Sequence, residues 1–133
     1  MATVRWARAM QPTPRKLTTH QKAVLIQVLL AFPDQQVGVT YHPLASDARD
    51  YAQDFLTVFT VIGWKVNAGA PSESLNRQSS GLAFVVNEEG SLPPSAEALR
   101  DALRVFGVEV ATVSDPAYST APGGFILSVG ARA

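Results

Sequence analysis

Val37-Gly38-Val39-Thr40-Tyr41 is the stretch from which the fold of this chain is best approached. Every second residue of it is larger and apolar, which is typical of a strand with one face turned to a core. An amphipathic stretch follows, with apolar residues three and four positions apart, and it ends at Gly63. A second strand is expected at Trp64-Lys65-Val66. The order strand, helix, strand predicts a β-α-β unit.

The same order recurs further along the chain. The continuously apolar run Leu82–Val86 is expected to be a central strand, covered on both faces. It is followed by Pro93-Pro94-Ser95 and a second amphipathic stretch, which stops at Gly107. A fourth strand is expected over Val108–Val113 and a fifth over Phe125–Val129. Two consecutive β-α-β units predict an α/β domain.

A helix is expected before the first unit. Thr18 and Gln21 have the spacing of a capping box, and Pro33 stops the helix after about Phe32. This helix is apolar almost all round, so it is expected to be covered on more than one side. Either it lies inside the domain, or Leu25 and Leu29 face another chain. A further helix is expected after Ser46, which would be its N-cap.

Two topologies fit these elements. In a Rossmann-like three-layer sandwich, strands one to four are parallel, and residues 67–81 cross the sheet. In a ferredoxin-like α+β two-layer sandwich, strands two and three pair antiparallel, and the helices cover one face. Three helices and two continuously apolar strands favour the three-layer form. The missing helix between strands two and three favours the alternative.

The composition is that of one compact domain. The chain has 133 residues, of which 47% are hydrophobic and 17% charged, and it has no cysteine. Disulfides, thiolate metal sites and cysteine nucleophiles are therefore excluded. We divide the chain into a basic arm or linker, residues 1–16, and a single α/β domain, residues 17–133.

The formal net charge of zero conceals an asymmetry. Residues 1–22 carry five basic residues and no acidic one, whereas the rest carries six basic and eleven acidic residues. The arm, with Arg5, Arg8, Arg15 and Lys16, is therefore expected to dock on an acidic surface of its own body or of a partner subunit, or on an anionic membrane surface. Nucleic acid is disfavoured as a partner, because the arm offers no row of aromatic residues beyond Trp6.

One candidate ligand site follows from the three-layer topology. If strands one and three are parallel neighbours, their carboxyl ends bring two loops together, where α/β sheets bind small molecules. The loops contribute Tyr41, His42 and Asp47 on one side and Asn87 and Glu88 on the other. His42 could act as a base, oriented by one of the carboxylates.

Other chemistries find no support in the sequence. No glycine-rich phosphate loop separates the first strand from its helix, so nucleotide binding in the usual mode is disfavoured. His20 and His42 do not have the spacing of metal ligands, and we expect neither a metal nor a cofactor. No catalytic residue is assigned, and an enzymatic activity is less expected than a binding role.

Four short segments resemble a loosely defined set of bacterial α/β domains that often follow a transmembrane helix. They are Leu17-Thr18-Thr19-His20-Gln21, Asp47–Ala52, Gly63-Trp64-Lys65-Val66 and Val129-Gly130-Ala131-Arg132. The resemblance covers residues 17–132. Because the members are mostly uncharacterised, it implies a fold but no activity.

The expected function is that of a non-enzymatic interaction domain, such as an accessory or assembly module, using the apolar first helix and the basic arm. A small-molecule-binding or hydrolytic domain is the alternative. The partner would be another protein or a second copy of the chain. No signal peptide or membrane-spanning run is present, so the chain as written is expected to be soluble and cytoplasmic. In a longer chain, residues 5–16 would lie beside a membrane helix.

Overall fold

The chain forms one mixed sheet covered by helices. The computed structural model describes residues 15–68, 81–86, 92–114 and 125–130. Within them the elements are α2 (Thr19–Leu29), β1 (Gln36–Tyr41), α3 (Ala48–Val61), β2 (Lys65–Ala68), β3 (Leu82–Val86), α5 (Pro94–Val105), β4 (Val110–Ser114) and β5 (Phe125–Val129). The α/β class predicted from the sequence is confirmed. The predicted loop over residues 67–81 lies for the most part outside the described residues.

The five strands lie in the order β2-β1-β5-β3-β4. β1 is parallel to β2 and to β5, and β3 is parallel to β4. β3 and β5 are antiparallel. Both predicted β-α-β units are therefore present, but they run in opposite directions on the two sides of β5.

Two of the expected strand pairings are wrong. The first four strands are not all parallel, and β2 and β3 do not pair with each other, because β5 and β1 lie between them. The last strand of the chain is inserted at the centre of the sheet, a placement that no local pattern specifies. The choice between a Rossmann-like and a ferredoxin-like description stays a prediction.

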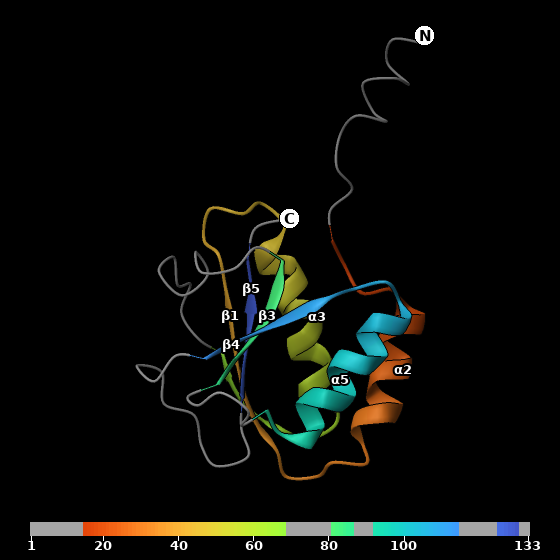
Figure 1. Cartoon of the computed structure of the whole chain (residues 1–133). Helices are drawn as coiled ribbons and strands as arrows, with labels where there is room; N and C mark the ends of the chain where they lie inside the picture. Colours follow the sequence, from red (N-terminus) through yellow and green to blue (C-terminus); the bar gives the residue numbers. More distant parts are fainter. Residues whose placement is uncertain (1–14, 69–80, 87–91, 115–124, 131–133) are drawn as a thin grey trace, which may run out of the picture.

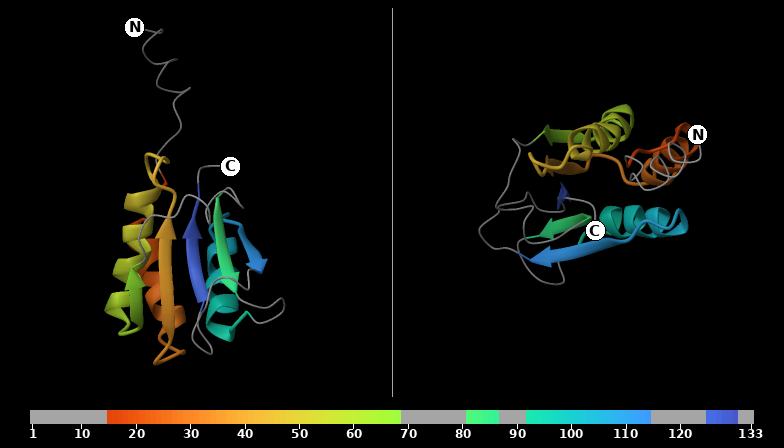
Figure 2. Two further views of the ribbon diagram at one scale, coloured as in Figure 1. Left: turned by 90° about the vertical axis from the view of Figure 1, so that its left-hand side faces the viewer. Right: turned by 90° about the horizontal axis from the view of Figure 1, so that it is seen from above.

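All three described helices lie on one face of the sheet (Figures 1 and 2). α3 packs on β1, β2 and β5, α5 packs on β4, and α2 packs against both α3 and α5. Leu25 and Leu29 of α2 are fully buried in the core between these elements. These two leucines are thus core residues of this chain, and the expectation that another part of the helix faces a second chain stays a prediction.

The helix ends follow local chemistry. Thr18 and Gln21 form the predicted capping box at the start of α2. α3 continues through its β-branched residues to Val61 and is followed by Gly63 at φ 82°, a left-handed conformation that glycine adopts without strain. The prediction of Ser46 as the N-cap is wrong. Asp47 holds that position, and its side chain makes no capping bond because it is bound elsewhere.

A row of touching aromatic rings joins α3 to the sheet. Successive ring centroids along this row are 5.1 to 6.4 Å apart. The rings belong to Tyr51, Phe55, Phe59, Trp64, Phe125 and Phe84. Aromatic side chains bury more apolar area than other residues, so this row provides much of the packing between the two layers. β3 is buried on both faces, as its apolar sequence predicted.

Candidate functional site

The predicted ligand site required a strand arrangement that the described strands do not have. It required β1 and β3 to be parallel neighbours, but β5 lies between them, and β1 and β3 run in opposite directions. The carboxyl ends of the two strands therefore lie at opposite ends of the sheet, measured along the strand direction. Asn87 and Glu88 themselves lie outside the described residues.

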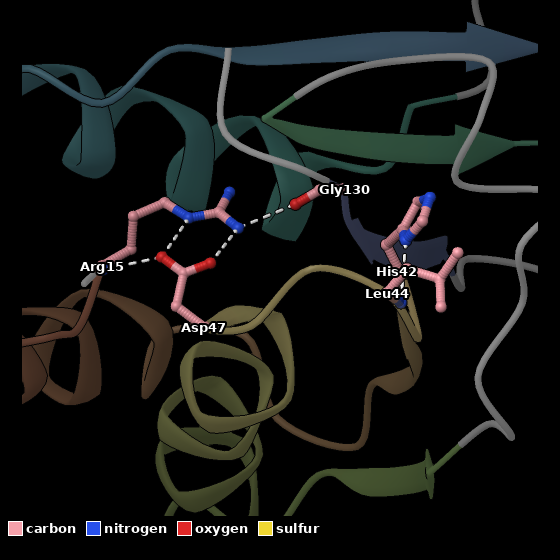
Figure 3. Close-up of polar contacts among 5 residues, drawn as sticks. All are labelled: Arg15, His42, Leu44, Asp47 and Gly130. Atoms are coloured by element: carbon pink, nitrogen blue, oxygen red, sulfur yellow. Dashed lines mark hydrogen bonds and ion pairs between the residues drawn. The ribbon is translucent and has the colours of Figure 1, made fainter. Parts of the chain in front are cut away.

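The β1 side of that site has a local structural role. The backbone N–H of His42 donates to the carbonyl of Val129, at the end of β5. Nδ1 of His42 accepts a hydrogen bond of 3.1 Å from the backbone N–H of Leu44. This bond closes the turn after β1, and Figure 3 shows His42 and Leu44 well separated from Asp47. Tyr41 and His42 are each half-buried.

Asp47 is bound by Arg15 in a two-pronged ion pair (Figure 3). Nη2 of Arg15 donates to Oδ1 at 2.9 Å, and Nε donates to Oδ2 at 3.0 Å. The backbone N–H of Arg15 also donates to Oδ2, and Nη2 donates to the carbonyl of Gly130. The guanidinium lies over the ring of Tyr51, 5.3 Å from its centroid. Arg15 thus ties the start of the described chain to α3 and to the end of β5.

The pair is largely removed from water. The side chains of Arg15 and Asp47 are 15% and 11% exposed. The hydrogen bond from the Arg15 side chain lowers the pKa of Asp47 from 3.8 to about 2, against the opposing effect of burial. Burial raises the pKa of Tyr51 from its usual 10.0. Among the described residues, Nη1 of Arg15 is buried without a hydrogen-bond partner.

Residues 15–22 are bound along one face of α3. Asp47, Tyr51 and Asp54 share this face, at spacings of four and three residues. Asp54 accepts a 2.9 Å hydrogen bond from the backbone N–H of Leu17 and forms a 3.5 Å ion pair with Lys22. Leu17 itself is buried in the core. Arg15, which the sequence places in the arm, is therefore fixed to the acidic surface of its own body.

The other predicted interaction residues are placed differently. Lys16 is exposed, so it is available to an outside partner. Arg5 and Arg8 lie outside the described residues. Leu25 and Leu29 are buried, so the predicted use of α2 as an interaction surface is wrong at these two positions.

The two edges of the sheet differ in chemistry. β2, at one edge, has four residues and starts with an exposed lysine, Lys65. Charged side chains and shortness are the usual means by which proteins prevent an edge strand from pairing with other chains. β4, at the other edge, reads Val-Ala-Thr-Val-Ser, without a charge or a proline. Ala111 and Thr112 on it are exposed.

An exposed apolar side chain, Val105, comes before this edge strand in the sequence. Val105, the last residue of α5, is 84% exposed, the highest value for a large apolar side chain among the described residues. α5 is the helix that packs on β4. Phe106 and Val108, which connect the two elements, are half-buried. We call β4 together with Val105 the β4 edge.

Sequence reasoning missed both features. Arg15 was assigned to the arm because no pattern links it to Asp47, 32 residues away. The β4 edge depends on strand order, which the sequence does not specify. No signal in the sequence marked this edge, because the strand predicted over Val108–Val113 includes the charged Glu109.

Comparisons with other proteins identify no relative. No protein family, no curated protein and no solved structure matches this chain. Within the described ranges, no helix is long and apolar enough to span a membrane. The same ranges hold no group of three or more acidic or histidine side chains arranged to bind a metal ion.

Proposed function

We propose that this chain is a non-enzymatic interaction domain, an accessory or assembly module that binds an extended segment of a protein partner at the β4 edge. The single observation that supports this proposal is the state of that edge. Among the described residues, β4 pairs with β3 alone, and it contains no charged residue and no proline. An added strand would gain main-chain hydrogen bonds there.

The contacts of other described residues support the same proposal. Asp47 forms an ion pair with Arg15, and Nδ1 of His42 accepts the hydrogen bond that closes a turn. Contacts within the chain therefore account for both side chains without a ligand. The sheet itself is held by a core of fully buried side chains on the helix side. A rigid sheet of this kind offers its edge as a preformed template, which lowers the entropic cost of adding a strand.

Site-specific photo-crosslinking tests the proposal. A photoreactive amino acid is placed at Thr112 on β4 and, as a control, at Thr60 on α3, since both positions are exposed. We expect a crosslinked protein at position 112 but not at position 60, with the crosslink mapped by mass spectrometry to an extended segment of the partner. Equal or absent crosslinking at the two positions, in cells that express the chain at its natural level, would contradict the proposed function.

A further inference from the structure

Two copies of the β4 edge can pair with each other, and this bears on the identity of the partner. β4 has five residues, all uncharged, and three of them are β-branched. Two such strands can approach without like charges meeting, and β-branched residues pack well across paired strands. An uncharged strand also gives no electrostatic preference for an oppositely charged partner.

The charges that flank the strand are arranged in a way that permits self-pairing. Glu109, immediately before β4, is 77% exposed and lies 3.8 Å from Arg104 of the same chain. In an antiparallel pairing centred on Ala111, Glu109 of one copy faces Val113 of the other, and Val110 faces Thr112. No two like charges are opposed over residues 109–113. The axis of such a pairing is a two-fold axis, so the same surface is used by both copies.

From these observations we infer that the occupant of the β4 edge is a second copy of this chain, bound by antiparallel pairing of β4 with β4 to form one continuous sheet. The inference rests on the proposed function and specifies its partner. Ala111 lies opposite its own counterpart at the two-fold axis.

A charge-swap experiment tests this arrangement on the full chain. Ala111→Lys and Ala111→Glu each set like charges against each other across the axis, so each variant alone is expected to dimerise at least about tenfold more weakly than the wild type. An equal mixture of the two variants opposes unlike charges instead. We expect this mixture to form a one-to-one heterodimer, detected by native mass spectrometry and analytical ultracentrifugation.

Matched controls keep the result interpretable. Thr60→Lys and Thr60→Glu place the same charges on the exposed side of α3, and both variants are expected to dimerise like the wild type. Circular dichroism and thermal unfolding establish that every variant is folded, and recovery of pairing in the mixture cannot come from a misfolded chain.

Two outcomes would overturn the inference. The first is a wild-type chain that stays monomeric at concentrations near 1 mM, well above a micromolar dissociation constant. The second is a dimer that persists unchanged in both Ala111 variants. The proposed function would survive either result if position 112 still crosslinks to a different protein, and it would fail if position 112 crosslinks to nothing.

Discussion

Arg15 and Asp47 are joined side by side, with two side-chain hydrogen bonds of 2.9 and 3.0 Å and a third from the backbone of Arg15. The pair connects the segment before α2 to the start of α3, and through Gly130 to the end of β5. Because both side chains are largely buried, breaking the pair would leave a charge poorly hydrated. This relationship makes residue 15 part of the folded body.

Acid should destabilise the protein through Asp47. Its pKa is lowered from 3.8 to about 2 in the folded state, so its stabilising contribution is complete above about pH 4 and is lost as the pH falls toward 2. The shift corresponds to at most about 2 kcal/mol. The unfolding free energy of Asp47→Asn, measured by urea titration, should be lower than that of the wild type at pH 6. It should also fall less than that of the wild type between pH 4 and 2. Asp50→Asn, an exposed carboxylate on the same helix, should retain the wild-type pH dependence. An unchanged acid profile in Asp47→Asn would contradict the assignment.

Deletions from the N-terminus should lower the stability of the protein only when they remove Arg15. A chain that lacks residues 1–12 keeps the ion pair and should unfold at the wild-type temperature. A chain that lacks residues 1–16 removes Arg15 from Asp47 and should lose about 1–3 kcal/mol of stability, between the values of exposed and buried pairs. Differential scanning calorimetry on the two truncations measures this difference. Equal melting temperatures would show that the pair contributes nothing measurable.

Leu25 should behave as a core residue and not as a contact surface. Leu25 is fully buried, whereas Leu30, next to the end of α2, is 58% exposed. Leu25→Ala should lower the unfolding free energy by about 2–4 kcal/mol, because it opens a cavity. Leu30→Ala should change it by less than about 0.5 kcal/mol. If Leu25→Ala left stability unchanged and altered only self-association, the burial of this side chain would be disproved.

The arm should bind anionic surfaces through its basic residues other than Arg15. Arg5 and Arg8 are the candidates in the sequence, together with the exposed Lys16. Replacing all three by glutamine should reduce sedimentation with phosphatidylserine vesicles at low salt, and this difference should disappear as salt rises, because exposed charges are screened beyond about 8–10 Å. Neutral phosphatidylcholine vesicles are the control. Equal binding of both proteins to anionic vesicles in low salt would reduce the arm to a solvated tail.

Local patterns predicted the elements well. Thr18 and Gln21 marked the start of α2, and the apolar spacing up to Gly63 outweighed the poor helix propensity of residues 57–62. These signals succeed because caps, turns and amphipathic stripes depend on residues within a few positions of one another. Asp47 holds the N-cap position predicted for Ser46, although its carboxylate is bound by Arg15, 32 residues away, and makes no capping bond.

The candidate site was less predictable, and Asp47 shows why. The sequence placed it in a ligand site with Glu88, whereas the fold pairs it with Arg15, which the sequence assigned to a free arm. Both errors concern contacts between distant segments, for which no local pattern exists. The β4 edge could not be recognised from its sequence, because the predicted strand Val108–Val113 includes Glu109 and the place at the edge follows only from the strand order.

The sequence by itself determined that this is an α/β domain built from two β-α-β units after a capped helix, because alternation, amphipathic spacing and helix stops act over short distances. Only the tertiary structure decided that β5 lies between the two units, that β3 and β4 run opposite to β1, and that β4 is left at the edge. The insertion of β5 depends on burying the apolar faces of strands that are far apart in the chain. That burial energy is collective, so it has no signature in any single segment.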